Sequence, residues 1–521
     1  MATNTKRGWT TGDTVAAADA NRWENRARSH TYIYAPYNAD QRVKDGADEV
    51  GVSDLAFNRL GLQLAIEAAD DVHGAPLKLV AGTVNIDREI TIVAANGGGM
   101  EGENGRTTIA ANAAWQSQAT RMLENPGTSA ARRSYARVKD VYFDGNKGSV
   151  SYTTNGIVFD YNDYVLIEGC TFNNNRGYGI NLNNCSRVII RNCTFLNSAD
   201  YAIRLTSCSN VFVENCYFYV CYGGVWIDNS TDVSVVNCKI QQPTYHGVYV
   251  NGTGCFRPVI LGNTITNSAS GHGIDFYCGG ARTRLNSVIS SNVLQQNNLR
   301  GIYLDGYDKN LVVGNSSVGN YQHGINMLNS DEDTITGNYT ELNSLRGIHI
   351  ESSSRRCAIV GNKSVNDGNI GISIWSSSHD ALVEGNEVYY NGQQGIAVDT
   401  CDRANVTGNT VHSSNYEGIS VYNCDSPSVR GNYLFSNSRS SNLGYAHIKL
   451  SGTSKNGVVA HNTCRWDSSA GWKTNYGVYI NGTGATGNYV CENDLRYGYG
   501  TAALQQDTAA TTLLATNSNW S

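Results

Sequence analysis

The sequence is poor in proline, has no excess of basic charge and contains no long apolar run. Proline accounts for 6 of 521 residues and glycine for 55, which favours short strands joined by tight turns. The net charge of −6 argues against nucleic acid as a partner, because nucleic-acid binders usually carry a basic stripe. Without an apolar run of about 18 residues or a signal peptide, we expect neither membrane insertion nor the usual secretion route.

The sequence signatures of several enzyme classes and metal sites are also absent. We find no P-loop, no Ser-His-Asp signature, no zinc pattern of the CxxC type and no calcium-type cluster of aspartates. We therefore expect no cofactor and no metal ion. Fourteen cysteines would indicate disulfides in a small secreted protein, but most of them fall on a repeat period. Reduced, buried packing groups are the favoured interpretation, with disulfides or a bound metal as the alternatives.

A Gly-apolar-x-apolar phrase recurs along most of the chain, usually every 22 to 24 residues. Repeats of this kind pack only on their neighbours, so one long solenoid domain is possible despite the length of the chain. Strand alternation directs Ile157 and Phe159 inward and Val158 outward. The repeat predicts an all-β fold, a right-handed parallel β-helix of about fourteen coils between roughly residues 137 and 490. Its copies start at Gly156, Gly179, Ala202, Gly224, Gly247, Gly273, Gly301, Gly324, Gly347, Gly371, Gly395, Gly418 and Gly477.

A second column of like residues lies between these phrases. Stacked coils are about 4.8 Å apart, so buried Asn amides in such a column are expected to hydrogen-bond to one another along it. The column consists of Cys170, Cys193, Cys216 and Cys238, followed by Asn263, Asn292, Asn315, Asn338, Asn362, Asn386, Asn409, Asn432, Asn462 and Asn488.

The ends of the chain depart from the repeat and define three segments. Residues 1–50 are predicted to form an attachment segment, residues 51–490 the β-helix, and residues 491–521 a cap or a subunit contact. Residues 54–71 have helical spacing, which predicts an amphipathic helix that caps the open N-terminal end of the solenoid.

Two parts of the sequence resemble known families. The segments "APLKLVAGTVNI" and "GMEGENGRTTI", with the preceding helix and the "NCTF" coils, resemble the pectate-lyase-like β-helix of phage tailspikes and polysaccharide-acting enzymes. The N-terminal "RGWTTGDTVAAADANRWENRAR" resembles the opening of minor tail proteins of tailed bacteriophages. The resemblance implies a homotrimeric tailspike or tail-fibre protein in the virion tail, attached through its N-terminus to other tail or baseplate proteins. The helix lacks the Asp-Asp-Thr start frequent in tailspikes, so the subfamily stays open, and an ordinary N-terminal extension is the alternative for the first segment.

Aromatic, acidic and basic side chains gather on the outward face of the coils, most densely between residues 246 and 305. Sugar rings stack on aromatic side chains, and carboxylate, Arg and His groups bind hydroxyls, so a bacterial surface polysaccharide is the predicted partner. Longer steps before Gly273 and Gly301 predict inserted loops that wall a cleft there. The predicted substrate-binding residues are Trp226, Tyr249, Tyr303, His246, His272, Arg300 and Tyr277.

Glycoside hydrolysis needs a carboxylic acid and a carboxylate about 5 to 9.5 Å apart. Asp275 and Asp305 are predicted one coil and two strand positions apart, roughly 8 Å between backbones, and are the first choice for catalysis. Asp228 and Glu351 are the next choices. Each could instead be an ordinary surface carboxylate. Because we expect Asp275 and Asp305 to be exposed, Asn at either position should lower turnover by orders of magnitude while stability hardly changes.

These features predict a polysaccharide depolymerase of the glycosidase type. A lyase or uronate epimerase is an alternative, in which Arg300 would neutralise a uronate and His272 or Tyr303 would abstract the C5 proton. The third possibility is a receptor-binding or structural tail protein without catalytic activity, because the coil motif serves many functions.

Overall fold

The computed structural model describes residues 77–92, 98–103, 106–115, 119–279, 283–466, 472–496 and 499–506, together with residue 62 and short strands at 33–35, 49–50 and 512–515. The chain forms two compact units, residues 1–259 and 260–521. The predicted capping helix lies outside the described residues apart from Leu62, which is helical and buried. In the described part, no helix is long and apolar enough to span a membrane.

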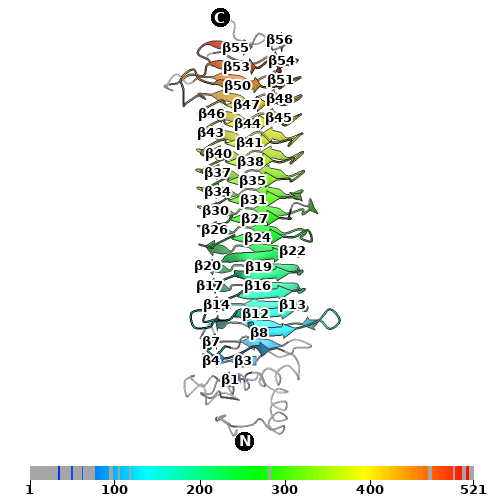
Figure 1. Ribbon diagram of the computed structural model, residues 1–521, viewed down its shortest axis with the longest axis vertical. Coiled ribbons are helices and arrows are strands. Elements are labelled where there is room, and N and C mark those ends of the chain that lie inside the picture. The colour runs from blue at the N-terminus through cyan, green and yellow to red at the C-terminus, as the bar shows by residue number, and fades with distance from the viewer. Residues whose placement is uncertain are drawn as a thin grey trace. The chain divides into compact units, whose positions relative to one another are not determined.

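In the first unit, the strands of each coil are distributed over three parallel sheets (Figure 1). Sheet A contains β1 (Ile33–Ala35), β2 (Glu49–Val50), β3 (Leu77–Leu79), β6 (Gly99–Glu101), β9 (Arg133–Ser134), β10 (Arg137–Lys139), β13 (Asn162–Glu168), β16 (Ser186–Arg191), β19 (Ser209–Glu214) and β22 (Thr231–Val236). Sheet B contains β4 (Gly82–Ile86), β7 (Thr107–Ala111), β11 (Val141–Asp144), β14 (Thr171–Asn173), β17 (Thr194–Leu196), β20 (Tyr217–Tyr219) and β23 (Lys239–Gln241). Sheet C contains β5 (Ile90–Thr91), β8 (Arg121–Pro126), β12 (Asn155–Asp160), β15 (Ile180–Asn183), β18 (Tyr201–Thr206), β21 (Gly223–Asp228) and β24 (Val248–Asn251).

The second unit repeats this arrangement, and β25 (Val259–Leu261) contains the boundary between the units. Its sheet A contains β29 (Val288–Ser290), β33 (Leu311–Val313), β36 (Thr334–Thr336), β39 (Ala358–Val360), β42 (Leu382–Glu384), β45 (Asn405–Thr407), β48 (Ser428–Arg430), β51 (Val458–Ala460), β54 (Asn488–Cys491) and β56 (Thr512–Ala515). Sheet B contains β26 (Thr264–Thr266), β30 (Val293–Gln295), β34 (Ser316–Val318), β37 (Tyr339–Glu341), β40 (Lys363–Val365), β43 (Glu387–Tyr389), β46 (Thr410–His412), β49 (Tyr433–Phe435) and β52 (Thr463–Arg465). Sheet C contains β27 (Ile274–Tyr277), β31 (Ile302–Asp305), β35 (Ile325–Leu328), β38 (Ile348–Glu351), β41 (Ile372–Trp375), β44 (Ile396–Asp399), β47 (Ile419–Tyr422), β50 (Ala446–Ser451), β53 (Tyr476–Asn481) and β55 (Ala502–Gln506).

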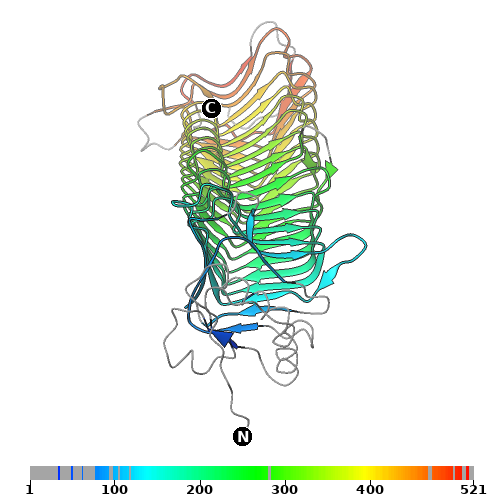
Figure 2. The same cartoon turned by 60° about the horizontal axis from the view of Figure 1, so that its bottom comes forward.

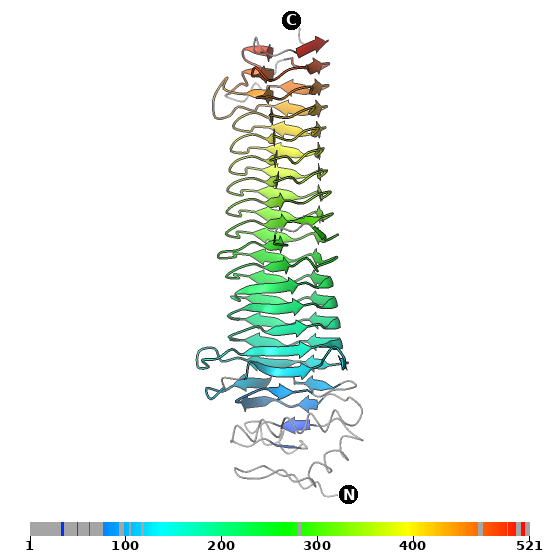
Figure 3. The ribbon, with the colours of Figure 1, turned by 45° about the vertical axis from the view of Figure 1, so that its right-hand side comes forward.

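Strands at the same place in consecutive coils pair in parallel, which is the pattern of a parallel β-helix. Ile157 pairs with Ile180 in the first unit, and Ile302 pairs with Ile325 in the second. Figure 2 shows the chain winding through the sheets in turn, and Figure 3 shows the strands of each sheet aligned in columns. The predicted fold class is therefore confirmed. The solenoid has about 17 turns, more than the predicted fourteen, because coil strands also precede residue 137 and follow residue 490.

Apolar side chains that point inward form continuous stacks in each unit. Ile157 and Phe159 are fully buried, as predicted from the alternation. On sheet B of the first unit, the rings of Phe172 and Phe195 stack with centroids 5.0 Å apart, and Phe195 stacks on Phe218 at 4.8 Å. Offset stacking of such rings contributes about 0.5 to 1.5 kcal/mol per pair beyond the burial of their area.

The asparagine column forms a buried hydrogen-bond ladder in the second unit. In a typical rung, Asn362 Nδ2 donates to Asn386 Oδ1 at 3.0 Å and to the backbone oxygen of Ile335 at 2.9 Å. From Asn462 the ladder continues to Asn493, whose Oδ1 accepts from Asn462 Nδ2 at 2.9 Å, so its predicted continuation to Asn488 is wrong. Ladder residues follow the end of a sheet A strand, whereas Asn488 is the first residue of β54.

The cysteines act as packing groups. All 14 are free and buried. Their thiols lie against backbone oxygens, as Cys193 Sγ does 3.3 Å from the oxygen of Arg191. The cysteines are therefore free, buried packing groups in this structure, as predicted.

Candidate functional site

The outward face of sheet C in the second unit carries three rows of side chains that follow the coils. We call them the edge row, the middle row and the outer row. The strand pairing fixes the middle and outer rows. The edge row consists of the residues just before each Gly phrase, His272, Arg300, His323, Arg346, Ile370, Gln394 and Glu417. The middle row is Asp275, Tyr303, Asn326, His349, Ser373, Ala397, Ser420 and Lys449. The outer row is Tyr277, Asp305, Leu328, Glu351, Trp375, Asp399, Tyr422, Ser451 and Asn481.

Asp275 and Asp305 occupy neighbouring coils in the predicted register. Asp275 pairs with Tyr303, and Tyr277 pairs with Asp305, so the two carboxyls are one coil and two residues apart. Both are buried, with 5% and 7% of their surface exposed, so the expectation that they are exposed is wrong. Burial, with repulsion from Asp305, raises the pKa of Asp275 to about 8, although Arg300 opposes this shift.

Arg300, Tyr303 and His272 form a stacked group beside these carboxyls. The Arg300 guanidinium carbon lies 4.4 Å from the centre of the Tyr303 ring, and the His272 ring lies 5.0 Å from it. Tyr303 Oη donates to Asp305 Oδ2 at 3.3 Å. Burial and the charge of Asp305 raise the pKa of Tyr303 above its ordinary value, so this phenol keeps its proton at neutral pH. Tyr277 is 41% exposed on β27.

Glu351 belongs to a separate polar group two coils beyond Asp305. His349 Nε2 lies 2.8 Å from Arg346 Nη1 and 3.2 Å from Glu351 Oε2, and one ring nitrogen can either accept from the first or donate to the second. Burial opposes ionisation of Glu351, but hydrogen bonds from His349 and Asn326 lower its pKa to about 2. Glu351 is therefore a carboxylate at neutral pH and is unsuited to the role of acid.

The remaining predicted site residues belong to the first unit and form an aromatic and cationic group there. Arg204 lies 4.3 Å over the Trp226 ring and forms an ion pair of 3.3 Å with Asp228. The Trp226 and Tyr249 rings are 5.9 Å apart, and His246 stacks on Tyr249 at 5.1 Å. Burial lowers the pKa of His246 to about 3, so this ring is neutral near pH 7.

The longer step before Gly301 adds a strand pair to the second unit. β28 (Thr283–Arg284) pairs in parallel with β32 (Tyr307–Asp308), next to β27 and β31 in the chain. Tyr307 is fully buried, and its Oη donates to the Tyr277 backbone oxygen at 3.3 Å. Tyr307 therefore supports the end of the strand that carries Asp275.

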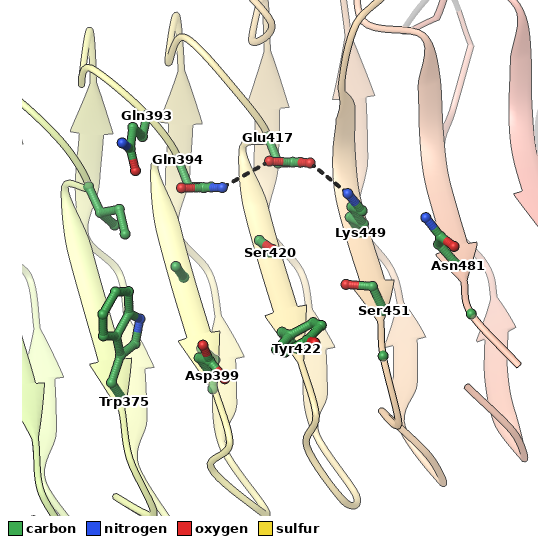
Figure 4. Close-up of a pocket in the computed structure, with 15 residues that line it drawn as sticks. Trp375, Gln393, Gln394, Asp399, Glu417, Ser420, Tyr422, Lys449, Ser451 and Asn481 are labelled. Carbon is green, nitrogen blue, oxygen red and sulfur yellow. Dashed lines mark hydrogen bonds and ion pairs between the residues drawn. The ribbon is translucent and has the colours of Figure 1, made fainter. Parts of the chain in front are cut away.

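A pocket of about 540 Å³ lies on the same face of the second unit, further along the chain (Figure 4). This volume lies in the usual range for small-ligand sites, about 300 to 1,000 Å³. Glu417 lies at one side of the pocket, where Gln394 Nε2 and Lys449 Nζ contact its two carboxylate oxygens at 3.1 and 3.2 Å. The lining includes Trp375, Gln393, Gln394, Ala397, Asp399, Glu417, Ser420, Tyr422, Lys449, Ser451 and Asn481.

Glu417 and Lys449, which contact each other at this pocket, are not among the site residues predicted from the sequence. Glu417 precedes Gly418, so it extends the edge row of His and Arg residues that the repeat made visible. Lys449 belongs to a coil in which His447 stands where the phrase has Gly, and the repeat was therefore not recognised there.

Comparison with known proteins establishes the family. The family model described as the right-handed β-helix region matches residues 127–287, 224–388 and 370–519, so the chain belongs to this family. No curated protein matches the chain.

Three solved structures are similar to this chain, and the first of them, with a TM-score above 0.5, supports the fold. The N-terminal fragment of gene product 12 from bacteriophage φ29 is 13% identical with a TM-score of 0.51, covering 85% of this chain and 90% of that one. The A-module of a mannuronan C-5 epimerase from Azotobacter vinelandii is 14% identical with a TM-score of 0.32, covering 87% and 94%. The surface adhesin PfbA of Streptococcus pneumoniae is 14% identical with a TM-score of 0.39, covering 73% and 88%. At these identities the likeness concerns the fold alone.

Proposed function

We propose that this chain is a phage tail protein that binds a bacterial surface polysaccharide and cleaves it as a glycoside hydrolase. The observation that carries the proposal is the carboxyl pair of the second unit. Asp275 has a pKa of about 8 and so keeps its proton at neutral pH, as a general acid must. Asp305 lies one coil away and receives a hydrogen bond from Tyr303, and it is the proposed base.

The distance between the two carboxyl groups would decide the stereochemical outcome. One coil and two residues correspond to about 8 Å between the backbones of Asp275 and Asp305, and inverting enzymes hold their carboxyl groups about 6.5 to 9.5 Å apart, which leaves room for a water molecule. We therefore propose inversion at the anomeric carbon. The protonated Asp275 carboxyl would donate to the leaving oxygen, and the Asp305 carboxylate would take a proton from the attacking water.

The test uses purified capsular and cell-wall glycans and measures new reducing ends. The full chain and its Glu384→Gln variant, which removes an exposed acid on sheet A, should release them equally. Asp275→Asn and Asp305→Asn should each lower kcat by at least about a hundredfold, in the range of general acid–base catalysis. Binding of a glycan by the unmodified chain without new reducing ends would show a receptor-binding protein instead, and full activity in both Asn variants would exclude this pair.

A uronate lyase or epimerase is the second candidate, because Arg300 and Tyr303 lie together as such a reaction requires. The raised pKa of Tyr303 disfavours it, since abstraction of the C5 proton needs the phenolate. An unsaturated uronate product, measured by its absorbance, or an altered uronate ratio would support this candidate over the hydrolase.

We further propose a homotrimer that attaches to other tail or baseplate proteins through residues 1–50, placing the protein in the virion tail. The N-terminal phrase supports attachment, although most of that segment lies outside the described residues. An apolar stripe on sheet A of the first unit supports lateral association. Leu166 pairs with Ile189 and Ile189 with Phe212, and the last two are 37% and 50% exposed.

A further inference from the structure

The pocket of Figure 4 lies over small side chains of the middle row. Ala397 and Ser420 pair with each other on β44 and β47, at positions where other coils of the unit carry Tyr303 or His349. The missing side-chain volume leaves a hollow between the edge row and the outer row. Ala397 and Ser420 form the floor of the pocket, and Ser373 of the preceding coil continues the row of small side chains.

The walls of the pocket offer one aromatic surface on each side of an acid. The outer row places Asp399 between Trp375 and Tyr422, one coil from each. One face of the Trp375 ring is covered by Arg346, whose guanidinium carbon lies 3.7 Å from the ring centre. Arg346 thereby fixes the ring at the pocket wall. An apolar ring surface beside a hydroxyl-binding carboxylate is the combination that binds a sugar ring.

The charges of the lining select the kind of sugar. Glu417 is buried, and both of its oxygens are engaged by Gln394 and Lys449, so the charges of Glu417 and Lys449 compensate each other. Asp399 is hydrogen-bonded by Thr400 at 2.7 Å, and no cation pairs with it among the described residues. An acidic sugar would bring its carboxylate toward this uncompensated charge, whereas a hydroxyl or an ammonium group could donate to it.

We propose that this pocket is an anchoring subsite for one neutral or amino sugar of the glycan and that it disfavours a uronate. This inference rests on the proposed function in that the same glycan would extend to Asp305. In the outer row, Trp375 lies three coils from Asp305, about 14 Å along the solenoid. Lys449 and Gln394 bind sugar hydroxyls, and Trp375 and Tyr422 contact the ring. Because the pocket is remote from the reacting bond, it contributes to substrate binding and to KM.

The first experiment measures binding of glucosamine, glucose and glucuronate hexasaccharides to the full chain by calorimetry. The glucosamine and glucose oligomers should bind at least tenfold more tightly than the glucuronate oligomer. Ala397→Phe, which fills the floor, should weaken binding of both at least tenfold, while Leu382→Phe adds the same ring on sheet A and should leave it unchanged. Asp399→Asn should weaken binding of the glucosamine oligomer most and should strengthen binding of the glucuronate oligomer, whereas the charge-matched Glu384→Gln should change neither.

Several results would overturn the proposal. These are equal or tighter binding of the glucuronate oligomer, no binding of any of the three, or affinity within twofold in Ala397→Phe. With a glycan that the chain cleaves, Ala397→Phe should raise KM at least tenfold and leave kcat within twofold, and an unchanged KM would also refute the subsite. Intact binding to the pocket without any cleavage would refute the hydrolase and leave the subsite standing.

Discussion

The most informative perturbation is Asp275→Asn, because it should separate the stability of the protein from its activity. An ordinary aspartate has a pKa of about 3.9. In the folded chain the pKa of Asp275 is about 8. Between these values the unfolded chain ionises while the native carboxyl keeps its proton, so the native state binds more protons. The free energy of unfolding therefore decreases with rising pH, by up to about 1.4 kcal/mol per unit.

At pH 7, about three units above the ordinary value, the penalty amounts to about 4 kcal/mol as an upper limit. Asn has the same size, carries no charge and avoids this penalty. The variant should therefore unfold in urea at a higher midpoint than the unmodified chain at pH 7, and at a similar midpoint at pH 4. Its kcat should fall by at least about a hundredfold. An equal difference in unfolding free energy at both pH values would refute the argument that the native carboxyl is neutral.

Three further predictions concern catalysis, the core and assembly. The kcat of the unmodified chain should fall above about pH 8 as Asp275 loses its proton, and a profile that stays flat to pH 10 would exclude it as the acid. Asn362→Ala removes the oxygen that accepts from both the backbone N–H and the side-chain amide of Asn338. At about 1 to 3 kcal/mol per buried group, the loss should be about 2 to 6 kcal/mol in urea unfolding, against less than about 0.5 for the exposed Asn298→Ala. Phe212→Glu should convert a trimer to monomers by light scattering, while Tyr321→Glu, on an exposed residue of the second unit, should not, and a trimeric Phe212→Glu variant would contradict the lateral interface.

The fold could be predicted because the repeat expresses the packing directly. A residue type that recurs at one place in each coil must stack on its copies, so the Gly-apolar phrase and the Asn column identify strands and turns without any three-dimensional information. The prediction was wrong for Asn488, because the longer step before Gly477 shifts the register and a repeated residue type alone does not reveal the shift. Asn493 restores the ladder two residues after the end of β54.

The exposure of the site residues could not be predicted by strand alternation. Alternation places Asp275 and His349 on the outward face, and both are indeed in the middle row, yet both are buried. Long edge-row side chains such as Arg300 and Arg346 cover ring surfaces of the other rows. A side chain that points outward is therefore exposed to solvent only where the side chains of the neighbouring rows are short. The pKa of Asp275 depends on its burial and on Arg300 and Asp305, which belong to the next coil.

The pocket was missed for the opposite reason, since it is defined by what its coils lack. A search for aromatic and acidic residues emphasises crowded coils, whereas a cavity needs small residues such as Ala397 and Ser420 between larger ones. One wall also depends on a coil in which His447 replaces the repeating Gly and is buried in its place. Its middle-row residue, Lys449, contacts Glu417 from the preceding coil, so the two charges meet only when the coils stack. In a solenoid, a site that binds one ring is therefore best sought where a column is interrupted by small residues, and its charged partners are read from the coils on either side.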